Sequence, residues 1–225
     1  MLVGISGMIS SGKSTLTHKL VDFYGKHCLF LNEYEHDDEV FNTFLKWLYD
    51  RKNNIGLGFQ TYVVENHLAR VDSINYRFNL LGMDKDNEFI FLDRFCLEQY
   101  IFALVNLKTS QQKVWLAYQK AFEIMVSKEQ LPELVIYLDI DFDVFKQRIM
   151  QRGRDVEISN FEINKEYFKE LHATYKTMFL KLIEKYDLNC KIINTNNKNE
   201  EEVFIEAKNL IEEFKKNRNL KQSNE

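Results

Sequence analysis

Proline, glycine and cysteine are scarce in this 225-residue chain, which has one proline, eight glycines and three cysteines. With so few residues that interrupt helices, long helices are expected. The cysteines, Cys28, Cys96 and Cys190, lie far apart and form no C-x-x-C pair. This spacing argues against a disulfide framework or a thiolate metal site and favours a reducing compartment.

A strong charge of one sign and long apolar runs are also missing. The formal net charge is −4, so charge gives no reason to expect capture by nucleic acid or by an anionic membrane. No apolar stretch is long enough to span a bilayer, and the first residues lack the pattern of a signal peptide. With 45% hydrophobic residues the chain can bury a sizeable core. We therefore expect a cytoplasmic protein with no nucleic-acid or membrane partner.

Five short apolar runs alternate with stretches of helical periodicity, at residues 2–6, 28–31, 89–92, 134–138 and 191–193. Such alternation is typical of a parallel sheet, whose central strands are buried on both faces and therefore read as apolar runs. We predict an α/β fold with a five-stranded parallel sheet flanked by helices, in a single domain over residues 1–216.

The segment between the second and third runs, residues 35–86, is much longer than a crossover requires, which is about a dozen residues. We interpret it as a helical insertion that shapes a substrate pocket. The polar tail, residues 217–225, is expected to be frayed.

The segment GMISSGKS, from Gly7 to Ser14, matches the Walker A pattern in full and lies between an apolar run and a helical stretch. In such a loop, backbone N–H groups and the following helix N-terminus hold phosphates. Lys13 would reach the β- and γ-phosphates of ATP, and the Ser14 hydroxyl would bind Mg²⁺. The predicted ATP-binding residues are Gly7, Met8, Ile9, Ser10, Ser11, Gly12, Lys13, Ser14 and Thr15.

Charged residues follow the second and third apolar runs, where ligands of open α/β sheets bind. Asp93 and Arg94 follow the third run; Asp93 would hold Mg²⁺ with Ser14, and Arg94 would stabilise the transferring phosphoryl charge. Glu33 follows the second run, where a carboxylate can accept a proton from an attacking hydroxyl. An exposed acid at a helix N-terminus would look the same.

Arg148, Arg152 and Arg154 cluster after an amphipathic stretch, around Gly153. Positive charge on a mobile segment that excludes water is what phosphoryl transfer requires, so we predict an arginine-bearing lid over residues 151–160. A basic helix C-terminus is the alternative.

Together these residues resemble the deoxyribonucleoside kinase family, from the phosphate loop to the helix after the lid. The resemblance implies a P-loop, nucleoside-kinase-like fold, with Glu33 as the base that takes the 5′-hydroxyl proton. The Asp93-Arg94-Phe95 segment is similar to the family's Glu/Asp-Arg-Ser motif, although Phe95 departs from its serine. The Phe-Gln-x-Tyr motif matches residues 59–62, and this implies that Gln60 binds the nucleobase.

The same resemblance assigns further groups. Tyr49, eleven residues before Gln60, has the spacing of the tyrosine that binds the sugar 3′-hydroxyl. The Arg-x-Arg-x-x-Glu lid of the family falls on Arg152, Arg154 and Glu157, and its glutamate also holds the 3′-hydroxyl. Family members are typically homodimers, so a homodimer is expected.

The base-reading positions are less regular. His67 stands where purine- or cytosine-preferring members have an arginine, and Arg70 lies one helical turn further on. Glu98 is assigned as the acidic base reader, with a spacing that is ambiguous by one residue. This polar set, and a likeness to bacterial deoxyadenosine and deoxyguanosine kinases, favours a purine deoxynucleoside.

The sequence therefore predicts a phosphotransferase that uses ATP and Mg²⁺ to phosphorylate the 5′-hydroxyl of a deoxyribonucleoside in nucleotide salvage. The alternative is a nucleoside monophosphate kinase similar to thymidylate kinase, which shares the loop, the Asp-Arg pair and the lid. A GTP-binding switch would need Asp-x-x-Gly after the third run, where the chain has Asp93-Arg94-Phe95-Cys96.

Overall fold

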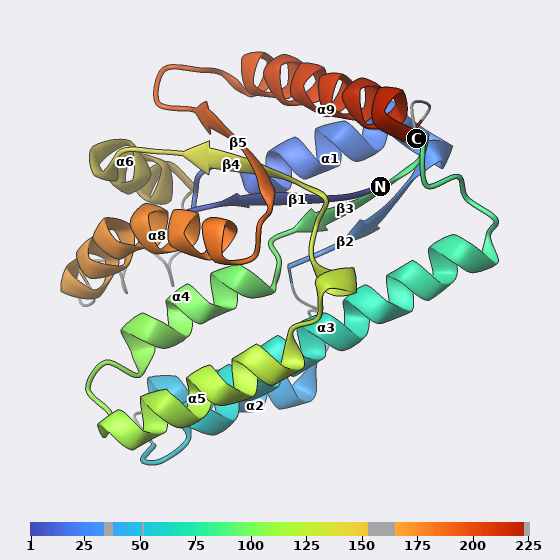
Figure 1. Ribbon diagram of the computed structural model, residues 1–225. Helices are drawn as coiled ribbons and strands as arrows, with labels where there is room; N and C mark the ends of the chain where they lie inside the picture. The colour runs from blue at the N-terminus through green and yellow to red at the C-terminus, as the bar shows by residue number, and fades with distance from the viewer. Residues whose placement is uncertain (34–37, 51, 153–164, 223–225) are drawn as a thin grey trace.

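The computed structural model describes residues 1–33, 38–50, 52–152 and 165–222. Its centre is one parallel sheet in the order β2-β3-β1-β4-β5 (Figure 1). The strands are β1 (Leu2–Gly7), β2 (Cys28–Leu31), β3 (Phe89–Asp93), β4 (Leu134–Asp139) and β5 (Asn189–Asn194). The predicted α/β fold with five parallel strands is confirmed.

Helices cover both faces of this sheet (Figure 1). On one face, α1 (Lys13–Tyr24) and α9 (Glu200–Gln222) pack together over the side chains of Val3, Ile5 and Phe91. On the other face, α4 (Cys96–Asn106) and α8 (Lys165–Lys185) pack against each other. The remaining elements at the strand ends are α6 (Phe142–Arg152) and two short 3₁₀ turns, η1 (Gly25–His27) and η2 (Lys128–Gln130).

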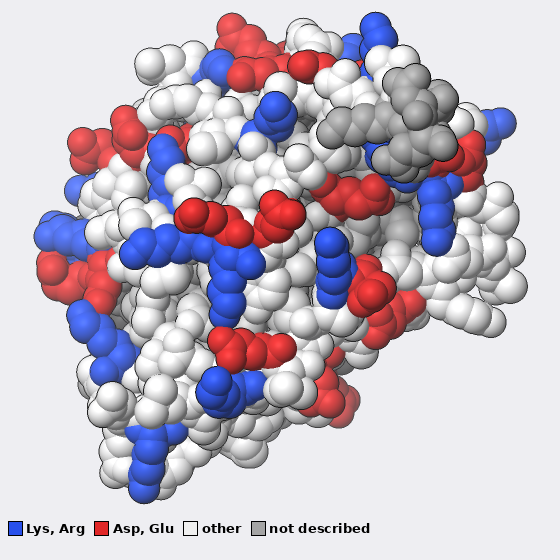
Figure 2. Space-filling model, in the orientation of Figure 1, with Lys and Arg blue, Asp and Glu red and all other residues white. Residues whose placement is uncertain are grey.

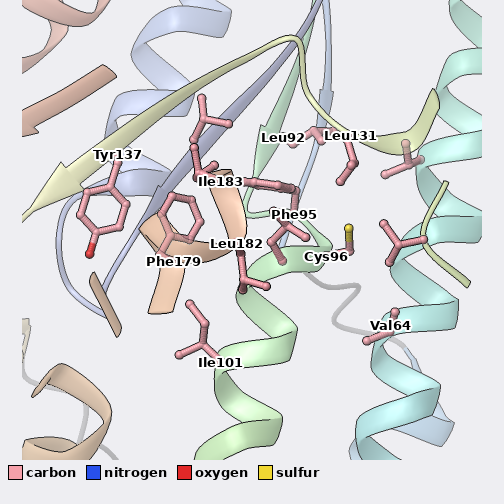
Figure 3. Close-up of a cluster of buried hydrophobic side chains, with 14 of the residues drawn as sticks. Val64, Leu92, Phe95, Cys96, Ile101, Leu131, Tyr137, Phe179, Leu182 and Ile183 are labelled. Carbon is pink, nitrogen blue, oxygen red and sulfur yellow. The ribbon is translucent and has the colours of Figure 1, made fainter. Parts of the chain in front are cut away.

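The sheet separates two apolar cores because successive strand residues point to opposite faces. Figure 3 shows part of the larger core, where Phe95 and Cys96 at the start of α4 lie among side chains from α8 and α3 (Gly56–Leu80). Phe95 contacts Phe179 edge to face, with ring centroids 6.0 Å apart. This packing fixes the start of α4, and with it the residues that follow Asp93.

Residues 35–86, the predicted insertion, contain α2 (Glu39–Tyr49) and α3 (Gly56–Leu80). Phe44 of α2 stacks on Phe59 and Tyr62 of α3. α3 also packs along α4 and α5 (Gln112–Met125), so the insertion is joined to the larger core (Figure 1). None of the helices in the described ranges has the length and apolar character that crossing a membrane requires.

The C-terminal helix continues further than the expected onset of fraying at residue 217. α9 runs to Gln222, and Arg218 forms ion pairs with Asp86 and Glu133, each at 3.0 Å. These contacts fasten the last turns of α9 to the loop before β3 and to the residue before β4. On the face seen in Figure 2, lysine and arginine side chains are interspersed with acidic ones, in keeping with the small net charge.

Candidate active site

The phosphate loop joins β1 to α1 through backbone conformations that glycine allows. Gly7 has φ +145°, and a Cβ there would lie 2.5 Å from the Leu138 carbonyl oxygen. Gly12 has φ +98°, just before α1 begins at Lys13. The buried hydroxyls of Ser10 and Ser11 have no hydrogen-bond partner among the described residues. A curled loop with unsatisfied donors at a helix N-terminus is suited to bind phosphate.

Lys13 lies inside this loop, 5% exposed, and its Nζ donates to the Met8 carbonyl at 3.0 Å. Burial, and after it the charge of the neighbouring Arg94, lower the pKa of Lys13 from 10.5 to about 8, while Glu33 and Glu98 oppose the shift. A phosphate in the loop would add negative charge beside Lys13 and would raise its pKa again.

A cavity of about 840 Å³ opens over the loop and extends to the start of α9. This volume lies within the range of ligand sites for molecules the size of a nucleotide. Its wall combines the loop, the ends of β2 and β3, part of α6 and the turn before α9. The lining residues include Ile9, Ser10, Ser11, Gly12, Lys13, Ser14, Thr15, Glu33, Asp93, Arg94, Arg148, Thr195 and Lys198.

Seven of the nine residues predicted to bind ATP therefore line the cavity, as do Glu33, Asp93 and Arg94. Gly7 and Met8 are buried beneath the loop, where their backbone groups hold its shape. Arg148 of α6 donates to the carbonyl oxygens of Ser11 and Thr195, at 3.3 and 2.6 Å. It thereby ties the phosphate loop to the turn after β5.

The site can accommodate Mg²⁺. Asp93, at the end of β3, is 3% exposed, and its Oδ1 is buried with no hydrogen-bond partner among the described residues. Ser14 lines the same cavity. No three His, Cys, Asp or Glu side chains in the described ranges gather as a metal cage. Mg²⁺ does not need one, because it is usually held by one or two carboxylates, waters and substrate phosphates.

Arg94 is the most constrained side chain of the site. Its φ is +72°, in the left-handed region, and its side chain is 3% exposed. Its Nε donates to Glu33 Oε1 at 2.5 Å, and Nη1 donates to Glu98 Oε2, also at 2.5 Å. Burial alone lowers the pKa of Arg94, but Glu33, Tyr175 and Glu98 raise it well above its ordinary value. The guanidinium is therefore a fixed positive charge beside the phosphate loop.

A much smaller cavity, of about 20 Å³, lies between α3 and the start of α4 and shares Glu33 with the large one. Its lining residues are Glu33, Asp38, Phe41, Tyr62, Val63, Asn66, His67, Arg70 and Gln99. His67 is 4% exposed, and its Nε2 has no partner among the described residues. Burial lowers the pKa of His67 to about 4, with a further contribution from Arg70, so its ring is neutral at physiological pH.

Glu98 and Gln60, two residues predicted to bind the substrate, line neither cavity, whereas Arg70 lines the small one. Glu98 is fully buried and lies outside the lining of both cavities, whereas the next residue, Gln99, lines the small one. Gln60 is buried and is likewise not part of either lining in the described structure. Arg70 donates to the carbonyl oxygens of Asn32 and Glu33, at 3.0 and 3.3 Å, which fastens α3 to the end of β2.

Sequence reasoning missed Gln99, although the one-residue ambiguity in spacing pointed to this turn. It also missed Asp38, which accepts from Phe41 N at 2.8 Å and so caps α2. The same carboxylate accepts from Tyr62 Oη at 2.9 Å and from Asn66 Nδ2 at 3.3 Å. Asp38 thus joins α2 to α3 in the wall of the small cavity.

The described structure does not place the side chains of four predicted residues. Arg154 and Glu157 fall within residues 153–164. Tyr49 and Arg152 end α2 and α6, and their side chains are not described. Their predicted roles at the sugar and in the lid remain predictions.

Comparison with known proteins gives a consistent result. The chain is 26% identical to a deoxyguanosine kinase from Lactobacillus johnsonii, over 85% of this chain and 80% of that protein. It is 28% identical to a deoxyadenosine/deoxycytidine kinase from Bacillus subtilis, over 83% and 84% of the two chains. A solved structure of deoxyadenosine kinase from M. mycoides has the same fold, with a TM-score of 0.71 and 21% identity, over 95% of this chain and all of that one.

The deoxynucleoside kinase family model matches residues 3–217, almost the whole chain, and thus includes every segment of the site described above. This protein is a kinase that belongs to the deoxynucleoside kinase family.

Proposed function

We propose that this kinase transfers the γ-phosphoryl group of ATP to the 5′-hydroxyl of a deoxyribonucleoside, in nucleotide salvage. The observation that carries the proposal is the position of Glu33, which lines both the large and the small cavity. A nucleoside in the small cavity would direct its hydroxyl past this carboxylate toward the phosphate loop. Glu33 is then the general base that takes the hydroxyl proton.

The other groups act on the phosphoryl donor. The loop N–H groups and Lys13 hold the phosphates of ATP, and Arg94 stabilises the charge that develops on the transferring group. Ser14 and Asp93 are the residues that would hold Mg²⁺, which neutralises charge on the β- and γ-phosphates when bound. The chain's own contribution is to place the acceptor hydroxyl in line with the transferring phosphoryl group and within reach of Glu33.

A purine deoxynucleoside, deoxyadenosine or deoxyguanosine, is the acceptor we favour. The small cavity offers the amide of Gln99 and the neutral imidazole of His67, which provide donors and acceptors for the polar edge of a base. At about 20 Å³ this cavity is far smaller than a nucleoside, so its walls must move apart to admit one. Relatives of this chain named as deoxyguanosine and deoxyadenosine/deoxycytidine kinases support this choice.

A nucleoside monophosphate kinase is less well supported. Its acceptor carries a phosphate, which requires extra cationic groups in the acceptor pocket. Within the described lining of the small cavity, the one permanent cation is Arg70, and it already donates to two backbone carbonyls. Glu33 and Asp38 add negative charge to the same wall, which disfavours a phosphate there.

The test is an ADP-release assay with ATP, Mg²⁺ and a panel of the four deoxynucleosides and their monophosphates. Turnover of one or two purine deoxynucleosides, with none of the monophosphates, is the expected result. Turnover of a monophosphate alone would replace the proposal with the nucleotide kinase and leave Glu33 without a role as base.

We also propose that the enzyme works as a cytoplasmic homodimer, as the resemblance to the family implies. Light scattering on the purified chain tests the assembly, and a monomer at micromolar concentration would contradict it.

A further inference from the structure

Glu98 is a carboxylate for which the proposed reaction provides no use. It lies in the first turn of α4, and its side chain is fully buried. Burying a carboxylate costs several kcal/mol unless strong partners compensate. Three groups meet its Oε2: Arg94 Nη1 at 2.5 Å, the Tyr175 hydroxyl, and the backbone N–H of Gly7 at 3.4 Å. The carboxylate therefore binds the phosphate loop, the end of β3 and α8 at one point.

Tyr175 is the second member of this cluster. It comes from α8, is fully buried, and its hydroxyl accepts from Arg94 Nη1 at 2.5 Å while donating to Glu98. Nη1 also donates to the Gly7 carbonyl at 3.2 Å. Both backbone polar groups of Gly7, the first residue of the phosphate loop, are thus held by the Arg94–Glu98 pair.

These bonds determine which part of Arg94 remains for a ligand. Glu33 takes Nε, and the Gly7–Glu98–Tyr175 group takes Nη1. Nη2 makes no hydrogen bond within the described structure, although Arg94 lines the large cavity. Partners on the other two nitrogens fix the plane of the guanidinium and leave the two Nη2 donors for a phosphoryl oxygen.

The backbone of Arg94 supports the same view. A non-glycine residue at φ +72° is strained and persists only where its surroundings hold it strongly. Its N–H donates to the Ile5 carbonyl at 3.0 Å, which ties the strained residue to β1. Two carboxylates and a tyrosine hold the side chain, and these contacts also keep the backbone of Arg94 in this conformation.

We infer that Glu98 and Tyr175 are positioning residues that fix the Arg94 guanidinium and the first residue of the phosphate loop as one unit. Neither residue contacts the nucleoside. This inference rests on the proposed role of Arg94 in stabilising the transferring group. It replaces the interpretation of Glu98 as a reader of the base.

The experiment compares Tyr175→Phe and Glu98→Gln in the wild-type and Arg94→Lys backgrounds. Tyr175→Phe keeps the buried ring and removes only the hydroxyl. Tyr24→Phe is the matched control, because it removes another hydroxyl–carboxylate bond between two helices, to Glu212 at 2.7 Å, outside both cavities. For each variant, kcat, KM for ATP, and kcat/KM for each accepted nucleoside are measured, together with Tm.

Tyr175→Phe is expected to lower kcat about tenfold and Glu98→Gln on the order of 100-fold. A displacement of the Arg94 guanidinium by about 1 Å is enough to lower the rate by about 100-fold. KM for ATP should change less than about twofold, and all nucleosides should be affected by the same factor. In the Arg94→Lys background, where no planar fork remains to be held, neither substitution should lower kcat further. Tyr24→Phe should leave kcat unchanged.

Three results would overturn the inference and leave the proposed function standing. A change in the order of preference among nucleosides would return Glu98 to the base. Undiminished losses in the Arg94→Lys background would show that the effect does not pass through Arg94. A lower Tm with unchanged kcat per folded molecule would make the cluster a stabilising contact only. Full turnover by Arg94→Lys alone would instead remove Arg94 from the proposed function, and this inference with it.

Discussion

Arg94 donates its Nε–H to Oε1 of Glu33 across 2.5 Å, which joins the ends of the neighbouring strands β3 and β2. The two partners differ in access, since the Arg94 side chain is 3% exposed and the Glu33 side chain 31%. The arginine is thus the fixed member of the pair, and the carboxylate is the member that a ligand can reach. This pairing distinguishes Glu33 from Asp38 and Glu39, the nearby acids in the described part of the chain, which sequence alone could not do.

Glu33→Gln is expected to lower kcat by about 10²–10⁴-fold, because the amide fills the same space but cannot take a proton. ATP binding should be nearly unchanged, since the phosphate loop and Lys13 are untouched. Steady-state ADP release gives kcat, and calorimetric titration with ATP gives Kd. Glu39→Gln is the control, because Glu39 is an exposed acid in the first turn of α2 that lines neither cavity. Comparable losses in the two variants would contradict a specific role for Glu33.

Lys13→Met is expected to abolish ATP binding and yet to stabilise the ligand-free protein at neutral pH. The pKa of Lys13 is lowered by burial from 10.5 to about 8, so the unfolded chain holds this proton more tightly than the folded one. Burying the protonated Lys13 therefore lowers the free energy of unfolding by an amount on the order of 3 kcal/mol below pH 8. This loss disappears as the pH rises to 10.5. Urea unfolding at pH 7 and pH 10 measures it. A variant less stable than wild type at pH 7 would refute the prediction.

Most of the fold follows from the sequence because the central strands are buried on both faces. All residues of β1 and β3 are buried, and each strand is an apolar run up to Ser6 in β1 and up to Asp93 in β3. β5 is an edge strand in which Ile193 alone is fully buried, so its pattern was short and its predicted start came two residues late. The backbone of β5 pairs with β4 from Asn189 onward, and this pairing defines β5 more than side-chain burial does.

The sequence predicted the site residues that lie at strand ends. It was less reliable for those on a helix, where the rotation of the helix determines which side chain faces the cavity. Asp93, Arg94 and Glu33 follow parallel strands, whose carboxyl ends meet at one edge of the sheet. Glu98 and Gln99 differ by about 100° around α4, and only the packing of Phe95 and Cys96 determines which of them faces the core. Tyr175 fits an apolar helical period, so nothing in its spacing revealed a hydroxyl bound to Arg94.

Gln99→Leu is expected to lower kcat/KM for the preferred nucleoside by about 10–100-fold, by removing hydrogen bonds to the base from a side chain of similar size. The loss should differ from one base to another, because each base presents different donors and acceptors. The nucleoside panel measures these ratios, and Glu98→Gln, with its uniform loss, is the comparison. An equal loss for every base in Gln99→Leu would argue against contact with the base.

The burial of His67 is expected to make the protein less stable at mildly acidic pH. Burial lowers its pKa from 6.5 to about 4, so protonation favours the unfolded chain. The free energy of unfolding should therefore fall progressively as the pH is lowered from 6.5 to 4, by a total on the order of 3 kcal/mol. His67→Gln, which does not titrate, should remove this part of the pH dependence in urea unfolding. Parallel stability curves for the two proteins between pH 7 and pH 4 would contradict the prediction.

Phe95, which stands in place of the family's serine, depends on a glycine in β1. Its ring is fully buried, and a Cβ at Gly4 would lie only 3.1 Å from Phe95 Cδ1 and 3.1 Å from Pro132 Cγ. Phe95→Ser should therefore leave a cavity and destabilise the protein by about 3–5 kcal/mol, as buried phenylalanine truncations do. Gly4→Ala should cost about 1–3 kcal/mol through overpacking.

The two substitutions should not be additive, because the methyl group of Gly4→Ala occupies space that Phe95→Ser vacates. The double variant is expected to lose less stability than the sum of the two single losses, as measured by urea unfolding, although the 3.1 Å approach to Pro132 Cγ remains. The double variant should also retain a sheet and phosphate loop able to bind ATP, since the contact lies beneath β1 and away from the cavity. A sum of the two single losses would mean that Gly4 and Phe95 are not a matched pair, and that the departure from serine has another cause.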